Sequence, residues 1–242
     1  MKIQILWPNT TSYFAACVNS LAQQADVSIC IADTQTPTDF DRNTLISSDV
    51  DTRVWRPFTG EEPSIGFETP DLLLVGGWVH RQYLQIARRL AGRTRRVLCL
   101  DNQWTGSGRQ RAAQLLRRRH IRPYFDSAFV PGKRQLAFAS KLGIDPSAVY
   151  PGLYACDPEA FGPHSPFNAA APFTFVGRLT EEKGLLLLLS AYSQYRREVQ
   201  NPRNLKIVGN GPLLSRYSRT QGTEWLGFLP PRQLSRILAE SH

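Results

Sequence analysis

The stretch from Phe173 to Gly211 restricts the fold of this chain more than any other part of the sequence. It begins with an apolar run, Phe173 to Val176, that favours a strand, and a second such run, Leu205 to Val208, lies near its end. Between the two runs, apolar side chains recur at the spacing of one helix face, at Leu185, Leu188, Leu189, Tyr192 and Tyr195. Glycines close both strand patterns. Two short apolar strands joined by a long helix predict a parallel strand–helix–strand unit.

The loop that leads into this helix carries two cations, Arg178 and Lys183. The first turn of a helix has free backbone N–H groups and the positive end of the helix dipole. An arginine fork and a lysine charge beside such a turn suit the two linked phosphates of a diphosphate. A simpler interpretation is that both are surface cations beside Glu181 and Glu182. Their spacing alone does not decide between these two interpretations.

The chain before this stretch alternates short strands with helices in the same way. The predicted strands span residues 2–7, 27–32, 52–55, 71–75, 96–100 and 125–130, and the predicted helices include 12–24, 107–120, 132–143, 212–221 and 233–240. This alternation predicts an α/β fold with a doubly wound parallel sheet in a first domain, residues 1–150. Residues 151–171 are rich in Pro, Gly and Ala, which indicates a linker. Because residues 172–242 supply few strands, we expect a second Rossmann-like domain that is incomplete.

Three segments in order, FVGRLTEEKG, LLLLLSAY and LKIVGNGP, resemble the donor-binding half of GT-B glycosyltransferases of the group 1 (family 4) type. The resemblance covers Phe173 to Leu229 well and the earlier chain more loosely. It implies that Arg178 and Lys183 hold the diphosphate of a nucleotide-sugar. It also implies that the turn after the second strand lies beside the same ligand: Gly209, Asn210 and Gly211. The family continues into a motif with two glutamates, so the resemblance implies that this chain is truncated and inactive by itself.

Three predicted strands of the first domain are followed by a tryptophan: Trp7, Trp78 and Trp104. Ligands of open α/β sheets bind outside the carboxyl ends of the strands, and flat rings beside polar groups suit a sugar or an aromatic acceptor. The polar or glycine neighbours of these tryptophans are Asn9, Gly77, Asp101, Asn102 and Thr105. We therefore expect these loops to form an acceptor pocket that faces the donor site. The alternative is that the tryptophans only close the edge of the sheet.

Asp101 and Asn102 are the candidate catalytic residues, because they lie where the reacting hydroxyl is expected. A carboxylate there acts as a general base or orients the acceptor. Many members of the family have a Gly-rich turn after the first strand and a histidine after a later one, whereas this chain has WPNT and DNQW. Retaining members need no base, since the departing phosphate takes the proton. Under the resemblance, Asp101 needs only to position the acceptor.

The chain is basic, with a net charge of +9, and is therefore attracted to phosphate in nucleotides, nucleic acid or lipid. Arginines gather at two predicted helix ends, within 88–96 and 117–122. They either stabilise those ends by about 0.3–1 kcal/mol each or form a docking face for an anionic membrane surface. No nucleic-acid-binding motif, signal peptide or membrane-spanning run is visible. The histidines lack metal-ligand spacing, and the scattered cysteines indicate buried free thiols in a reducing cytoplasm.

These features together predict a hexosyltransferase-like enzyme that moves a sugar from a nucleotide-diphosphate sugar to a small-molecule, lipid or glycan acceptor. By resemblance, the reaction retains configuration and needs no metal or other cofactor. The alternative is a non-catalytic nucleotide-sugar-binding or membrane-associated scaffold of the same fold. We expect a cytoplasmic protein, at most peripheral on the inner face of a membrane, without a nucleic-acid partner. The residues select no particular sugar, base or acceptor.

Overall fold

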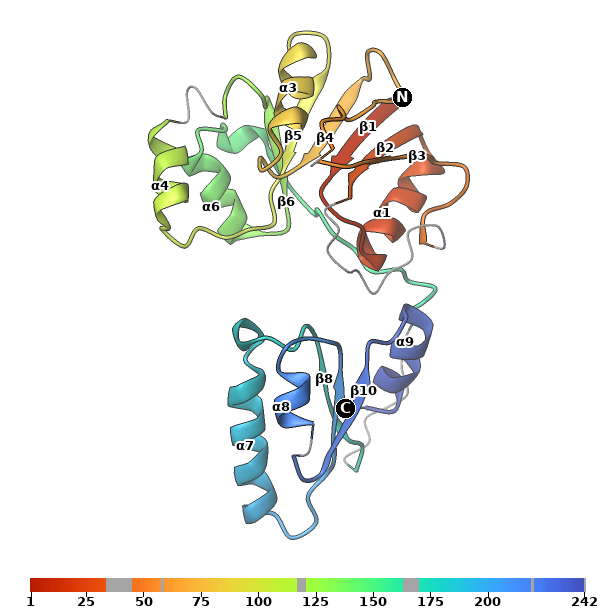
Figure 1. Ribbon diagram of the computed structural model, residues 1–242, viewed down its shortest axis with the longest axis vertical. Coiled ribbons are helices and arrows are strands. Elements are labelled where there is room, and N and C mark those ends of the chain that lie inside the picture. Colours follow the sequence, from red (N-terminus) through yellow and green to blue (C-terminus); the bar gives the residue numbers. More distant parts are fainter. Residues whose placement is uncertain (34–44, 58, 117–120, 163–169, 219, 242) are drawn as a thin grey trace. The chain divides into compact units, whose positions relative to one another are not determined.

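The computed structural model describes residues 1–33, 45–57, 59–116, 121–162, 170–218 and 220–241. The chain forms two compact units, Met1–Cys156 and Asp157–His242, each with its own parallel sheet (Figure 1). The division between Cys156 and Asp157 lies inside the predicted linker, residues 151–171. Each unit is described by itself.

The first unit is built on a seven-stranded sheet in the order β3-β2-β1-β4-β5-β6-β7, in which all neighbouring strands are parallel. Its strands are β1 (Lys2–Trp7), β2 (Asp26–Ala32), β3 (Asp51–Trp55), β4 (Leu72–Gly76), β5 (Arg95–Cys99), β6 (Ser127–Val130) and β7 (Val149–Pro151). Its helices are α1 (Ser12–Ala22), α3 (Arg81–Arg89), α4 (Gly108–Leu115), α6 (Lys133–Lys141) and the 3-10 turn η1 (Pro146–Ala148). The predicted doubly wound parallel sheet is therefore confirmed, and β7 extends it to the start of the predicted linker.

The strand order reverses at β1, which has β2 on one side and β4 on the other. In open α/β sheets, the carboxyl ends of the strands at such a reversal border the crevice where ligands bind. The side chains of β1 alternate between the two faces, because Ile5 packs in the core with α1 and Leu6 packs in the core with α3. Both faces of β1 are buried, so the sites that remain open are the loops at its ends.

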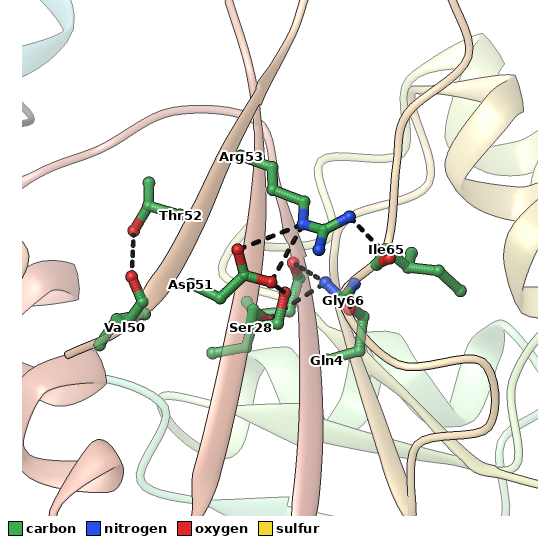
Figure 2. Close-up of polar contacts among 9 residues, drawn as sticks. Gln4, Ser28, Val50, Asp51, Thr52, Arg53, Ile65 and Gly66 are labelled. Carbon is green, nitrogen blue, oxygen red and sulfur yellow. Dashed lines mark hydrogen bonds and ion pairs between the residues drawn. The ribbon is translucent and has the colours of Figure 1, made fainter. Parts of the chain in front are cut away.

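A polar cluster lies toward the amino end of this sheet, where β1, β2 and β3 meet the loop before β4 (Figure 2). The fully buried Gln4 amide accepts a hydrogen bond from the Gly66 N–H at 2.8 Å and donates one to the Ser28 carbonyl at 3.2 Å. The Asp51 carboxylate accepts from the Ser28 hydroxyl at 2.9 Å and from Arg53 Nε at 3.0 Å. Arg53 Nη1 also donates to the carbonyl that precedes Gly66 at 2.9 Å. The cluster thereby holds the long loop against the sheet.

Replacing Gly66 with Ala is expected to lower the free energy of unfolding by about 1–3 kcal/mol, as overpacking does. A Cβ at Gly66 would overlap Ser28 Oγ and Asp51 Oδ2, and both side chains are held by the cluster. Urea denaturation of the variant measures the loss. Gly108→Ala is the matched control, because a Cβ there meets no atom within 4 Å. An equal loss in the two variants would contradict the packing explanation.

The second unit has a three-stranded parallel sheet in the order β10-β9-β8. Its strands are β8 (Phe173–Val176), β9 (Leu205–Val208) and β10 (Thr223–Gly227), and its helical segments are η2 (Glu181–Lys183), α7 (Leu185–Glu198), α8 (Leu214–Tyr217) and α9 (Pro231–Ala239). Leu185, Leu189 and Tyr192 of α7 are buried against Leu205 and Ile207 of β9. The predicted strand–helix–strand unit and its buried helix face are therefore confirmed.

Two helix boundaries differ from the predictions for local reasons. The helix predicted over 212–221 is only the four-residue α8, because the N–H and the hydroxyl of Thr220 both donate to the Tyr217 carbonyl and end it. Helix α1 begins at Ser12 as predicted, with the Thr11 hydroxyl accepting from the Phe14 N–H at 3.4 Å, but it ends at Ala22 rather than residue 24, where the next N–H groups turn back to the Leu21 carbonyl. The end predicted for α4 falls on residues 117–120, outside the described residues.

One member of the predicted arginine cluster at 88–96 is not a surface cation. Only 6% of Arg96 is exposed, and its guanidinium binds both carboxylate oxygens of Asp126, at 2.6 and 3.0 Å. It also donates to the Pro123 carbonyl at 2.7 Å. The exposed arginines of this cluster are Arg88, Arg89, Arg93 and Arg95. The prediction that Arg96 belongs to a surface patch is therefore wrong.

The four cysteines fall into two environments. Cys30 and Cys99 are buried as predicted, and burial raises the pKa of the Cys30 thiol to about 11. Cys17 is partly exposed and Cys156 is exposed, so the expectation of a buried thiol is wrong at these two positions. Among the described residues, no helix combines the length and the apolar character that crossing a membrane requires.

Candidate functional site

The turn after β8 carries the two predicted donor cations. It runs through η2 to Gly184, whose φ of 72° lets the chain enter the 14-residue helix α7. The side chain of Arg178 is 71% exposed, and Lys183 is exposed as well. Both cations therefore lie on the surface just before the first turn of a long helix, where backbone N–H groups and the helix dipole favour an anion.

Arg178 is held by an acidic neighbour in the same loop. Its Nη2 atom lies 2.6 Å from Glu182 Oε1, and the Glu182 side chain is 61% exposed. This contact agrees with the simpler interpretation of a surface ion pair. However, an exposed pair of this kind contributes only about 0–1 kcal/mol, so a ligand with two phosphates can displace Glu182 at little cost.

The glycine turn after β9 touches this loop through the main chain. The Leu179 N–H donates to the Asn210 carbonyl at 2.9 Å, and the Leu213 N–H donates to the Leu179 carbonyl at 3.2 Å. Gly209 has a φ of 134°, and a Cβ there would overlap the Gly177 carbonyl. A Cβ at Gly211 would lie 2.6 Å from the Leu179 carbonyl oxygen. Only glycine permits this approach, so the structure brings the loop with Arg178 next to the turn from Gly209 to Gly211.

The three predicted acceptor tryptophans lie in two different environments. Trp7 is buried, with 7% of its surface exposed, because its ring stacks on Phe14 at a centroid distance of 4.4 Å. Trp78 and Trp104 are half-buried and both pack edge-on against Phe138, at 5.6 and 5.4 Å. Trp78 and Trp104 thus share one site, and the Trp7 ring has almost no surface left for a ligand.

A cavity of about 220 Å³ lies beside Trp78. Its lining is apolar except for one cation: Trp78, Arg109, Ala112, Ala113, Leu116 and Ile121. Gly77, the predicted neighbour of Trp78, has a φ of 78° and donates its N–H to the Cys99 carbonyl at 3.0 Å. Asn9 lies half-buried in the loop after β1. The carboxyl end of β4 therefore opens onto a small apolar cavity with an arginine at its wall.

The loop after β5 is organised by Gln110, a residue that the sequence analysis missed. Gln110 Oε1 accepts hydrogen bonds from the N–H groups of Thr105 and Gly106 at 2.7 and 3.0 Å, and its Nε2 donates to the Gln103 carbonyl at 2.9 Å. The Ser107 hydroxyl in turn accepts from the Gln110 N–H at 3.4 Å and caps α4. Ser-x-x-Gln before a helix is the capping-box pattern, so this pattern could have identified Gln110.

Asp101 and Asn102, the predicted catalytic residues, are both exposed at the start of this loop. The Asp101 carbonyl accepts from Gln135 Nε2 at 3.0 Å, and its carboxylate accepts from the Tyr154 hydroxyl at 3.2 Å. Tyr154 was also missed, because it lies in the predicted linker. Within the described part of the chain, no group of three or more His, Cys, Asp or Glu residues could hold a metal ion.

No protein-family model matches the sequence, and no curated protein matches it. Solved structures do match. HepE from Anabaena, in complex with UDP-glucose, is 14% identical with a TM-score of 0.64, over 97% of this chain and 71% of that one. The lipopolysaccharide outer core galactosyltransferase WaaB is 14% identical with a TM-score of 0.57, over 100% and 72%. An alpha-glucosyltransferase in complex with UDP-glucose and DNA is 11% identical with a TM-score of 0.61, over 100% and 71%.

These likenesses show that the chain has the fold of the GT-B glycosyltransferases, as the sequence predicted. At such identities the likeness extends to the fold alone, because one fold hosts many functions. The chain spans about 71% of the length of HepE and of the alpha-glucosyltransferase. The function of the site depends on its own residues.

Proposed function

We propose that this chain is part of a glycosyltransferase that moves a sugar from a nucleotide-diphosphate sugar to an acceptor. The observation that supports the proposal is the main-chain contact between the loop at Arg178 and the turn from Gly209 to Gly211. This contact lies just before the first turn of α7, with Lys183 in the same loop. Backbone N–H groups, a helix dipole and two exposed cations, one of them in an exposed pair with Glu182, suit a diphosphate.

In the proposed reaction, an acceptor oxygen bonds to the anomeric carbon of the sugar while the bond from that carbon to the diphosphate breaks. The electron pair leaves with the diphosphate, so negative charge develops there in the transition state. Arg178 and Lys183 would neutralise this charge, and such electrostatic stabilisation is often the largest catalytic contribution. By family resemblance, the reaction retains configuration and the leaving phosphate accepts the proton of the acceptor.

The acceptor would bind at the carboxyl ends of β4 and β5. Asp101 and Asn102 are exposed there, and Trp78 and Trp104 share their contact with Phe138. We propose that Asp101 accepts a hydrogen bond from the reacting hydroxyl and orients it. The acceptor class, whether a small molecule, a lipid or a glycan, is set by groups around this loop.

The test is a thermal-shift screen of the protein with UDP-glucose, UDP-galactose, GDP-mannose and the free nucleotides. A ligand at 100 times its dissociation constant stabilises the folded state by about 2.7 kcal/mol, so one donor should raise the melting temperature. Trp225 is the only tryptophan of the second unit and the other four lie in the first, so the part of the emission that is lost in Trp225→Phe reports the unit expected to bind. Inorganic pyrophosphate and the free sugars are the controls.

Two outcomes would decide against the proposal. If no nucleotide-sugar stabilises the second unit, the diphosphate site does not exist. If pyrophosphate alone stabilises it as much as every nucleotide-sugar does, the site does not recognise a donor. If the full-length protein binds the donor but neither transfers its sugar nor hydrolyses it, a non-catalytic nucleotide-sugar-binding scaffold is favoured instead.

A further inference from the structure

A tyrosine near the end of the first unit reaches the candidate acceptor site. Tyr154 follows β7, and its hydroxyl donates to Asp101 Oδ2 at 3.2 Å across 53 positions of sequence. Gly152 and Leu153, just before it, both donate their N–H groups to the Val130 carbonyl at the end of β6, at 2.9 and 3.3 Å. The main chain that presents Tyr154 is therefore fixed to the sheet, so the tyrosine projects from a rigid element.

The ring of Tyr154 is held on two sides. It lies edge-on to Trp7 at a centroid distance of 6.4 Å and edge-on to Tyr13 of α1 at 4.9 Å. Trp7 is fixed in its turn by stacking on Phe14 at 4.4 Å. Edge-to-face aromatic contacts of this kind favour one ring orientation. The direction in which the Tyr154 hydroxyl points is thus set by β1 and α1, and not by the exposed loop of Asp101.

Asp101 depends on these contacts because it is exposed at the start of a loop. Its carbonyl is held by Gln135 of α6, and one carboxylate oxygen is held by Tyr154. No hydrogen bond from the described residues reaches the second carboxylate oxygen, so it can accept one from a ligand hydroxyl. We propose that Tyr154 is a positioning residue that fixes the Asp101 carboxylate for the acceptor hydroxyl, and this role rests on the proposed function.

The raised pKa of the Tyr154 hydroxyl keeps this group protonated, so that it can always donate a hydrogen bond. Burial raises the pKa of the Tyr154 hydroxyl, and the negative charge of Asp101 raises it further. The other titratable neighbours that act in the same direction are Tyr13 and Cys99. The Tyr154 hydroxyl therefore keeps its proton at neutral pH and donates a hydrogen bond to the Asp101 carboxylate. An acceptor hydroxyl would meet the carboxylate in this hydrogen-bonded form.

The variant that tests the proposal is Tyr154→Phe, which keeps the ring and removes the donor. Crystal structures of the wild type and this variant give a readout that needs no activity. We expect the Asp101 carboxylate to leave its position in Tyr154→Phe and to keep it in Tyr13→Phe. Tyr13→Phe is the matched control, because it removes a hydroxyl from the ring that packs against Tyr154. An unmoved Asp101 carboxylate in Tyr154→Phe would overturn the proposal.

Kinetics of the full-length protein provide a second readout. Tyr154→Phe should lower kcat about tenfold at an unchanged donor KM, because a hydrogen bond to a charged group is lost on the acceptor side only. In an Asp101→Asn background, Tyr154→Phe should lower kcat no further. A general loss of stability would lower kcat in both backgrounds. If the wild type does not transfer a sugar from the donor, the proposed function is wrong. The crystal structures then still decide whether Tyr154 positions Asp101. If Tyr154→Phe transfers the sugar with the kcat of the wild type, the positioning role of Tyr154 is wrong.

Discussion

Replacing Lys183 with Ala is expected to reduce kcat/KM of the full-length protein by about 10²–10³-fold, and Arg178→Ala is expected to act similarly. Removing one preorganised group that stabilises developing negative charge has an effect of this size. The donor dissociation constant of each variant should rise as well, because in the proposed function both cations also contact the diphosphate in the ground state. Isothermal titration with the donor identified by thermal shift separates the binding effect from the loss in kcat.

Two matched variants make this expectation specific to the site. Glu182→Gln releases Arg178 from its carboxylate partner and should leave donor affinity equal or a few-fold tighter, since the exposed pair contributes about 0–1 kcal/mol. Arg197→Ala removes an exposed cation at the opposite end of α7 and should change nothing. Equal losses in Arg197→Ala and Lys183→Ala would mean that overall charge, and not the loop, attracts the donor.

Replacing Asp126 with Ala is expected to lower the free energy of unfolding of the first unit by about 3 kcal/mol. Breaking a buried ion pair by removing one partner typically costs about 3–5 kcal/mol, because a charge stays buried without compensation. Here the remaining charge is Arg96, whose side chain is 7% exposed, while the Asp126 side chain is 41% exposed. The partial exposure of the carboxylate places the expected loss at the lower end of the range.

The pH dependence of stability should change in the same variant. Burial of Asp126 opposes its ionisation, but the hydrogen bonds from the Arg96 side chain and backbone outweigh burial and lower the pKa of Asp126 below 3.8. A folded-state pKa below the unfolded value stabilises the fold at pH values above the unfolded pKa, and this contribution disappears as the pH falls through the folded pKa. Acidification below about pH 4 should therefore destabilise the wild type more than Asp126→Ala.

Urea denaturation between pH 3 and pH 7, followed by tryptophan emission, measures both effects. Glu62→Ala is the control, because Glu62 is an exposed carboxylate in the loop before β4. If Asp126→Ala and Glu62→Ala unfold at the same urea concentration at neutral pH, the Arg96 pair contributes nothing measurable.

The sequence predicted the parts of the fold that local patterns determine. The α7 face was predictable because Leu185, Leu189 and Tyr192 follow the helix period, and the strand Leu205 to Val208 was predictable because a short, largely apolar run is closed there by glycine. Arg96 was misassigned because a run of arginines at a helix end resembles a solvated surface. Its burial depends on Asp126, thirty positions away, and no local pattern encodes that pairing.

The candidate site was predictable only where its residues fall in one motif. The loop with Arg178 and Lys183 and the turn from Gly209 to Gly211 belong to consecutive segments, so their proximity follows from parallel strand pairing. Tyr154 approaches Asp101 through tertiary structure alone, which periodicity cannot show. The separation of Trp7 from the shared site of Trp78 and Trp104 depends on packing against Phe14 and Phe138, which also lies beyond sequence patterns.

The close main-chain contact between Gly177 and Gly209 has a consequence for how such a protein can diversify. The turn cannot acquire a side chain at Gly209 or Gly211 without being forced away from the loop, whereas a Cβ at Gly177 would make only ordinary contacts with the Phe175 ring. Under the proposed function, heritable changes in sugar or base preference would therefore arise at surrounding positions, while the backbone of the turn stays constant. Libraries that aim to alter donor choice should leave Gly209 and Gly211 unvaried and randomise the residues around them.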